Sequence, residues 1–306
     1  MNAIEIDNVT KSFGTHVAVR ALSLTVPAGC TYGFIGPNGS GKTTTLRMIM
    51  RILHPSSGSI RVLGESTTLA ANDRVGYLPE ERGLYKTMTV RAGLRFFAAL
   101  KGSRDRQAID DWLERLGLAD WAEKKIETLS KGMAQKVQFI AAVAAQPDLL
   151  LLDEPFSGLD PVNLEVLREA VLEQRRRGAT VVFSTHDMSM AEKMCDYVFM
   201  IYQGNKVLDG TLEDIRNRHG TDVIRVRLQG DTNGLRDLPG VLGVTDLGRF
   251  QDLRVQPGFD TQPLLAALMQ RGTVEHFELA RPSLHDIFVH IAGPREGEGN
   301  EPNVAE

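Results

Sequence analysis

The feature that most constrains this chain is a glycine-rich loop that fits the pattern G-x-x-x-x-G-K-S/T. It consists of Gly36, Pro37, Asn38, Gly39, Ser40, Gly41, Lys42 and Thr43. The loop lies between an apolar run, residues 31–35, and a helix-like stretch, residues 43–53. Glycines let the backbone approach phosphate oxygens closely, and the N-terminus of the following helix adds partial positive charge there. The sequence therefore predicts a strand, a phosphate-binding loop and a helix that together bind a nucleoside triphosphate.

Two side chains of this loop have separate predicted tasks. Lys42 is expected to reach the outer phosphates, and the hydroxyl of Thr43 is expected to be a ligand of Mg²⁺. We add Thr44, the next residue, to the nucleotide-binding set that begins at Gly36. The cofactors predicted at this point are a nucleoside triphosphate and Mg²⁺.

The size and charge of the chain restrict its class. A length of 306 residues exceeds one compact core, so we expect a large domain and a smaller one. The net charge of −4 gives no basic surplus, so no nucleic-acid partner is predicted. Cys30 and Cys195 are too few for a disulfide framework, and the N-terminal residues lack the layout of a secretory signal. A cytoplasmic protein is therefore expected.

No stretch of the sequence is apolar enough to cross a bilayer. The most apolar one, residues 139–152, is interrupted by Gln146, Pro147 and Asp148, well short of the ~20 apolar residues that a membrane helix needs. If the protein works at a membrane, we expect another chain to cross it.

The order of patterns along residues 1–215 is typical of an α/β nucleotide-binding core. Residues 4–9 and 22–26 alternate apolar and polar positions, which predicts a small antiparallel β layer. Residues 84–146 have a helical pattern and are predicted to form a helical subdomain. Residues 148–153 and 179–184 are short apolar runs on either side of a charged helix, residues 162–177. Such runs are typical of buried parallel strands, and the alternation predicts a right-handed, doubly wound sheet.

The pattern changes after residue 215. Strands at 223–228, 253–255 and 274–279 and a helix at 262–271 predict a small α+β domain over residues 216–292. Its last helix is expected to begin at Ser283, with Asp286 completing the cap. Leu284, Ile287, Phe288 and Ile291 are expected to form its packing face. Residues 293–306 combine glycine, proline and acidic residues and are predicted to be a disordered tail.

Two adjacent carboxylates follow the first apolar run. Asp153 is predicted to hold the Mg²⁺ shell, and Glu154 is predicted to accept the proton of the attacking water during phosphoryl transfer. Two acids at a strand end are common for structural reasons alone. Their place downstream of a phosphate loop favours the catalytic interpretation.

With these motifs in order, the first 215 residues resemble the ATP-binding subunit of ABC transporters. The stretch 129–133, Leu-Ser-Lys-Gly-Met, stands where that family has its LSGGQ signature. Ser130 can cap the helix that follows, although a capped helix by itself has no functional meaning. The resemblance implies that Ser130 and Gly132 contact the γ-phosphate of ATP bound by a second subunit, so that a head-to-tail homodimer holds each ATP.

The resemblance also assigns three residues outside the loop and the signature. Asp160 matches the family's D-loop, which crosses the dimer interface, but by itself it would be a turn residue. His186 matches the switch histidine that contacts the γ-phosphate and water, although a lone histidine at a strand end is usually structural. Phe13 matches the aromatic residue that stacks under adenine, with a strand-end core residue as the alternative.

Two departures from the family pattern affect the predicted mechanism. Glu80 stands where most relatives have a glutamine that touches Mg²⁺ and the attacking water. Because Mg²⁺ favours carboxylate oxygen, we assign Glu80 to catalysis and to the metal. Lys131 and Met133 replace a glycine and a glutamine of the signature. These departures, with residues 282–288, make the chain similar to the ATPase subunits of bacterial sodium-extrusion and drug-export systems.

The resemblance implies an ATPase that hydrolyses MgATP in a head-to-tail dimer and drives a separate polytopic membrane permease. This permease would hold the chain, as a peripheral cytoplasmic subunit, at the inner face of the cell membrane. The helical subdomain would transmit the motion as a lever. A soluble ABC-type ATPase acting on ribosomes or DNA is the alternative, and the sequence has neither a heptad run nor a basic arm to favour it. A nucleotide-binding regulator without turnover would require neither Glu154 nor His186.

Overall fold

The computed structural model describes residues 1–65, 72–81, 83–103, 105–219, 223–230, 232–256, 258–280 and 282–292. The chain divides into two compact units, Met1 to Leu212 and Glu213 onward. The sequence-based boundary between residues 215 and 216 falls just after this division. The tail expected at residues 293–306 lies outside the described residues.

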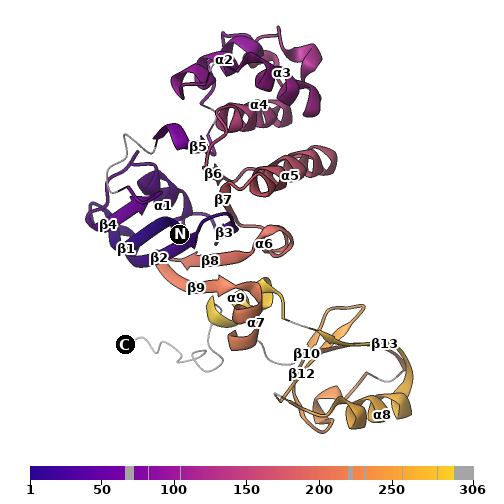
Figure 1. Cartoon of the computed structure of the whole chain (residues 1–306). Coiled ribbons are helices and arrows are strands. Elements are labelled where there is room, and N and C mark those ends of the chain that lie inside the picture. Colours follow the sequence, from indigo (N-terminus) through magenta and orange to yellow (C-terminus); the bar gives the residue numbers. More distant parts are fainter. Residues whose placement is uncertain are drawn as a thin grey trace, which may run out of the picture. The chain divides into compact units, whose positions relative to one another are not determined.

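The first unit is built on a six-stranded sheet with the order β5-β6-β7-β3-β8-β9 (Figure 1). Its strands are β3 (Thr31–Ile35), β5 (Val75–Leu78), β6 (Leu149–Asp153), β7 (Thr180–Thr185), β8 (Tyr197–Tyr202) and β9 (Asn205–Thr211). Neighbouring strands from β5 to β8 run parallel, and β9 is antiparallel to β8. All residues of β3, β6 and β7 are buried, as expected for strands that are covered on both faces. The predicted doubly wound α/β core is confirmed.

A smaller antiparallel sheet with the order β2-β1-β4 precedes and partly follows the glycine-rich loop in sequence. Its strands are β1 (Asn2–Phe13), β2 (His16–Pro27) and β4 (Ser57–Val62). The first two confirm the predicted β layer, and β4 was not predicted. Apolar side chains of this sheet share one core with a face of the central sheet and with α1 (Lys42–Ile49). The helix expected over residues 43–53 ends earlier because Arg51 takes a left-handed φ of 54°.

The predicted helical subdomain contains three main helices, which lie together (Figure 1). They are α2 (Val90–Leu100), α3 (Arg106–Arg115) and α4 (Lys131–Val143), with 3-10 turns at Ala119–Trp121 and Ile126–Thr128. Trp112 of α3 packs edge-on against Phe139 of α4, with ring centroids 5.7 Å apart. This unit also contains the helices α5 (Pro161–Arg176) and α6 (Met188–Met194) and a 3-10 turn at Asn72–Arg74. In the described parts of the chain, no helix is both long and apolar enough to cross a membrane.

The second unit contains a four-stranded antiparallel sheet with the order β11-β12-β10-β13. Its elements are α7 (Leu212–His219), β10 (Val223–Gly230), a 3-10 turn (Leu235–Asp237), β11 (Val241–Asp246), β12 (Gln251–Val255), α8 (Thr261–Arg271), β13 (Gly272–Ala280) and α9 (Leu284–Ala292). Leu264 and Leu268 of α8 pack with Ile224, Val226 and Leu253 of the sheet. The predicted strands and helix of this region are confirmed, and β11 was not predicted.

The cap of α9 agrees with the sequence, whereas its packing face is shorter than predicted. The Asp286 N–H donates to Ser283 Oγ at 3.1 Å, and the Ser283 N–H donates to Asp286 Oδ2 at 3.0 Å. Leu284 and Ile287 are buried, but Ile291 is 37% exposed. Phe288 is partly buried, and the prediction is wrong for Ile291, which lies in the last turn of α9.

Candidate functional site

All three glycines of the glycine-rich loop have positive φ values, and two of them also lie close to neighbouring strands. Gly36 and Gly41 have φ values of 154° and 116°. A Cβ atom on Gly36 would lie 2.2 Å from the backbone oxygen of Ile201, and one on Gly41 would lie 2.6 Å from that of Ala18. No larger residue can replace them without moving β8 or β2. These close contacts hold the loop against β8 and β2 at the point where it connects β3 to the N-terminus of α1.

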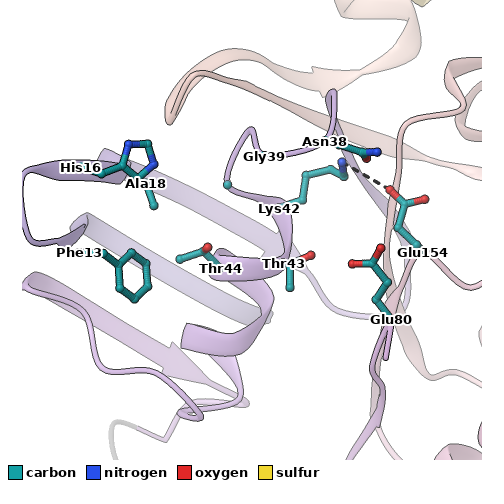
Figure 2. A pocket seen from close by; sticks show the side chains of 11 residues that line it. Phe13, His16, Ala18, Asn38, Gly39, Lys42, Thr43, Thr44, Glu80 and Glu154 are labelled. Carbon is teal, nitrogen blue, oxygen red and sulfur yellow. Dashed lines mark ion pairs between the residues drawn. The ribbon is translucent and has the colours of Figure 1, made fainter. Parts of the chain in front are cut away.

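A pocket of about 440 Å³ opens beside this loop (Figure 2). It is lined by Phe13, His16, Ala18, Asn38, Gly39, Gly41, Lys42, Thr43, Thr44, Glu80 and Glu154. Phe13 and His16 lie on one side, Glu80 and Glu154 on the other, and Lys42 and Thr43 between them (Figure 2). One end of the pocket is therefore aromatic, and the other end carries two carboxylates.

The aromatic end is open to solvent. Phe13 is 48% exposed, so it is not the core residue that the alternative interpretation required. Its ring has Lys11 Nζ at 5.0 Å from the centroid, and it pairs with His16 at the turn between β1 and β2. A flat ligand can stack on such an exposed ring.

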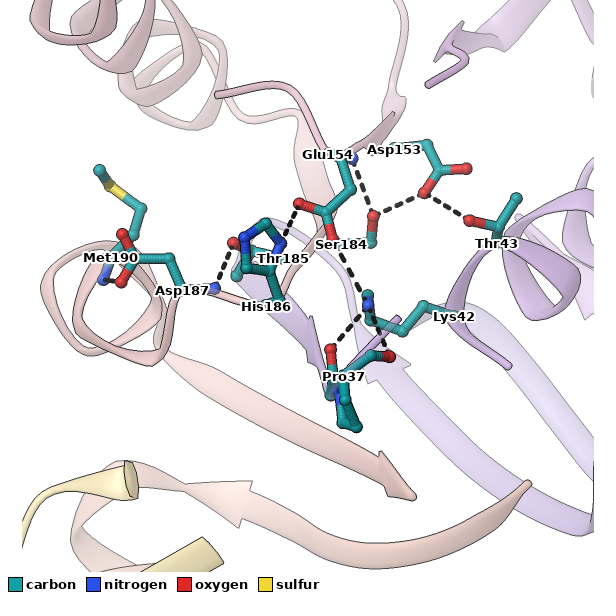
Figure 3. A network of polar contacts seen from close by, with 11 residues as sticks. Pro37, Lys42, Thr43, Asp153, Glu154, Ser184, Thr185, His186, Asp187 and Met190 are labelled. Carbon is teal, nitrogen blue, oxygen red and sulfur yellow. Dashed lines mark hydrogen bonds and ion pairs between the residues drawn. The ribbon is translucent and has the colours of Figure 1, made fainter. Parts of the chain in front are cut away.

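The carboxylate end is organised by a serine on the neighbouring strand (Figure 3). Asp153 ends β6 and lies opposite Ser184 in the register with β7. Ser184 Oγ donates to Asp153 Oδ1 at 2.6 Å and accepts the backbone N–H of Glu154 at 2.9 Å. The hydroxyl of Thr43 donates to the same Asp153 oxygen at 3.1 Å. The loop, β6 and β7 are thus joined at one carboxylate.

Glu154 lies between a lysine and a histidine (Figure 3). Its Oε1 is 3.4 Å from Lys42 Nζ, and its Oε2 is 3.0 Å from His186 Nδ1. Lys42 also donates to the carbonyl oxygens of Gly36 and Pro37, at 2.7 and 3.2 Å. Lys42 and Glu154 are almost fully buried, whereas His186 is about half exposed. The charges of Lys42 and Glu154 are therefore shielded from water. Electrostatic interactions are stronger in such a buried place than they are in water.

Among the residues that the structure describes, three buried oxygen atoms of the loop and the carboxylate end have no hydrogen-bond partner: Ser40 Oγ, Asp153 Oδ2 and Glu154 Oε1. The Lys42 ammonium is near enough to Glu154 Oε1 for an ion pair, but it makes no hydrogen bond there. Buried polar atoms normally have partners, so these oxygens mark places where a ligand group fits. A carboxylate and hydroxyl oxygens beside a cationic loop suit Mg²⁺ together with phosphate.

In the described part of the chain, Ser130, Gly132 and Asp160 neither line this pocket nor make the polar contacts around Asp153 and Glu154. Ser130 begins α4, where its Oγ accepts the Met133 N–H at 3.2 Å, which confirms the predicted cap. Asp160 caps α5, and a hydrogen bond from the Asn163 side chain is the main cause of its lowered pKa. A Cβ on Gly132 would meet Leu159 at 3.4 Å. Ser130, Gly132 and Asp160 therefore belong to a second patch, formed by the starts of α4 and α5.

Sequence reasoning gave no role to Ser184, which supports the carboxylates beside the pocket, or to His16, which lines it. Ser184 received no role, although it joins Asp153 to Glu154, because a serine inside an apolar strand carries no signal of its own. His16 lines the pocket beside Phe13. Its position two residues after the Gly14 turn could have indicated that it shares the same end of the hairpin.

A parallel sheet whose central strand leads through a phosphate loop into a helix, with paired carboxylates on a nearby strand, defines the class of P-loop ATPases. A family model described as "ABC transporter" matches residues 19–157, and one described as "ATP-binding protein DrrA1-3-like, C-terminal domain" matches residues 210–292. The chain belongs to the family of ABC transporter ATP-binding proteins, and it is an ATPase that binds nucleotide.

Individual relatives cover nearly the whole chain. The uncharacterized ABC transporter ATP-binding protein YhaQ of Bacillus subtilis is 41% identical over 95% of this chain and 98% of its own length. The Nod factor export ATP-binding protein I of Burkholderia lata is 35% identical over 95% of this chain and 97% of its own. The linearmycin resistance ATP-binding protein LnrL of Bacillus subtilis is 29% identical over 95% of this chain and 98% of its own length.

A solved structure has the same fold over most of this chain. It is described as an ATP-binding subunit of an ABC transporter, and it is 30% identical with a TM-score of 0.68. The match covers 71% of this chain and 93% of the solved chain. The similarity to this solved structure confirms the predicted P-loop fold.

Proposed function

We propose that this chain is the ATP-hydrolysing subunit of an ABC exporter and that it acts as a head-to-tail homodimer with a separate membrane permease. The observation that carries the ATPase chemistry is Glu154, held between Lys42 and His186 at the carboxylate end of the pocket. The export assignment is supported by two relatives, whose names state Nod factor export and linearmycin resistance.

In this proposal the adenine of ATP stacks on Phe13, and the backbone of residues 36–44 surrounds its phosphates. Lys42 exchanges its contacts with Gly36, Pro37 and Glu154 for phosphate oxygens. Thr43, Asp153 and Glu80 supply the oxygen atoms that would hold Mg²⁺, which neutralises charge on the phosphates when it is bound. Glu154 accepts the proton of the attacking water at its carboxylate, and His186 holds that carboxylate in place.

A second copy of the chain would complete the site. Ser130, Gly132 and Asp160 lie outside the pocket of their own chain, and Ser130 begins a helix of 13 residues whose first turn has no acidic side chain. Such a helix start attracts an anion, here the γ-phosphate of ATP bound to the other copy. This arrangement supports the head-to-tail dimer.

The membrane partner follows from the family. We propose that the helical subdomain contacts a polytopic permease and that the chain is held by it at the cytoplasmic face of the membrane. The test is to express the tagged chain in its native cell and solubilise the membranes in detergent. A polytopic membrane protein should co-purify and alter the ATPase rate. Recovery with ribosomes or DNA instead would favour the soluble ABC-type ATPase.

Replacing Glu80 by glutamine is expected to raise the Mg²⁺ concentration that gives half-maximal ATPase activity and to lower the maximal rate. Glu80 is exposed at the pocket wall, and its carboxylate attracts a divalent cation more strongly than an amide does. The measurement is ATPase activity against free Mg²⁺ at saturating ATP, with Glu81→Gln as the matched control. Unchanged Mg²⁺ dependence and rate in Glu80→Gln would contradict the assignment.

A further inference from the structure

Helix α4 carries three polar side chains that are buried: Gln135, Lys136 and Gln138. Each donates a hydrogen bond to a backbone carbonyl oxygen in a different segment. Lys136 Nζ reaches Leu116 at 3.0 Å, and Gln138 Nε2 reaches Glu81 at 3.3 Å. Gln135 Nε2 donates to the carbonyl of Pro155 at 3.0 Å, and this hydrogen bond ends directly beside Glu154.

The backbone of Glu154 needs such support. Its φ of 48° lies in the left-handed region, which residues other than glycine seldom adopt. A residue in this conformation persists only where its surroundings hold it. Glu154 is held on one side by its own N–H, which donates to Ser184 Oγ at 2.9 Å. The hydrogen bond from Gln135 to Pro155 holds the chain on the other side.

We propose that Gln135 is a positioning residue for Glu154 in ATP hydrolysis, an inference that rests on the function proposed above. Its amide fixes the carbonyl that follows Glu154, and thereby the direction in which the carboxylate leaves the backbone. The carboxylate then meets Lys42 and His186 at the distances observed. Gln135 lies on α4, the helix that begins at Ser130. Its side chain therefore connects this helix to the backbone beside Glu154, the proposed general base.

A role in packing alone would have different consequences. Gln135 is 7% exposed, so a change there could simply loosen α4. Gln174 of α5 offers a matched control, because it is 3% exposed and its Nε2 has no hydrogen-bond partner in the part of the chain that the structure describes. Its replacement alters a buried glutamine without removing a hydrogen bond to the backbone of the site.

The experiment compares Gln135→Leu with Gln174→Leu in the full chain. Leucine keeps most of the side-chain volume and removes the amide donor. Gln135→Leu is expected to lower kcat by roughly 10- to 100-fold, because small displacements of a reacting group are costly. The KM for ATP and the affinity for ADP should stay near those of the wild type. Gln174→Leu should retain the wild-type kcat.

The decisive measurement repeats Gln135→Leu in a Glu154→Gln background, with residual hydrolysis followed in single turnovers. If Gln135 acts through Glu154, its replacement should cause no further loss there. An equal loss in both backgrounds, or a wild-type kcat in Gln135→Leu, would overturn the positioning role. If Gln135→Leu does not fold, Gln135→Met gives the same comparison. Wild-type turnover in Glu154→Gln would instead overturn the proposed function, so the two failures are distinguishable.

Discussion

Glu154→Gln is expected to reduce steady-state ATP turnover by about 10²- to 10⁴-fold, the usual contribution of a general base. Glutamine has almost the same shape as glutamate, so the fold of the loop between β6 and α5 should persist. The amide cannot accept the proton of the attacking water. The variant should therefore still bind ATP but should hydrolyse it very slowly.

The contacts of Glu154 predict that nucleotide binding will not weaken in this variant. In the described structure Lys42 forms an ion pair with Glu154, and this pair has to open before Lys42 can reach a phosphate. Glutamine removes the charge that competes for the lysine. The affinity for ATP should be equal to or higher than that of the wild type.

The measurement combines phosphate release at saturating MgATP with equilibrium binding of nucleotide. Glu169→Gln is the matched control, because Glu169 is an exposed residue of α5 that pairs with Arg168 and Arg176. Surface ion pairs of this kind contribute little, so this variant should keep the wild-type rate. A rate in Glu154→Gln close to that of the control would contradict the assignment of the general base.

The parts of the fold that were predictable depend on short-range patterns. The phosphate loop is specified by a fixed spacing of glycines and Lys42. The strand before it is specified by the apolar run of residues 31–35, which are all buried in the structure. Strand β6 is equally clear, since its apolar run is bounded by Pro147 and Asp153. The caps at Ser130 and Ser283 were also predictable, because each acts on a backbone group only three residues away.

The elements that were missed owe their structure to distant partners. Strand β5 is four residues long and includes Gly76, which gives no strand signal. A Cβ on Gly76 would lie 2.3 Å from the carbonyl of Ala142, so this glycine is required by the close packing of α4. Ser184 and Gln135 contact groups about 30 and 20 residues away in sequence. No local pattern could have assigned them to the site.

The second large effect is expected from mixing two inactive variants. Lys42→Ala removes the cation that is proposed to reach the phosphates, and Gly132→Asp places a negative charge at the start of α4. A Cβ on Gly132 would meet its nearest neighbour at an ordinary 3.4 Å, so aspartate should not disturb the fold. Each variant alone should be almost inactive, since both sites of its dimer contain the defect.

A mixed dimer should regain one intact site, because the defects then fall on different half-sites. The pocket of the Gly132→Asp chain is intact, and it would face the intact helix start of the Lys42→Ala chain. With free exchange of subunits, half of the dimers are mixed and each has one working site of two, so roughly a quarter of the wild-type rate is expected. The measurement is the ATPase rate after exchange in ADP, compared with the sum of the two variants measured apart.

The control for this recovery is a mixture of Lys42→Ala with Glu154→Gln. Both of those defects lie in the pocket half of the site, so every site in the mixed dimer keeps one of them and no recovery is expected. Recovery in the first mixture but not in the second requires that one ATP be shared by two chains. If the rate of the first mixture is only the sum of the rates of the two variants, the proposal that each ATP is shared by two chains and that the two sites work independently is contradicted. Ser130, Gly132 and Asp160 would then lose their proposed role beside the phosphates.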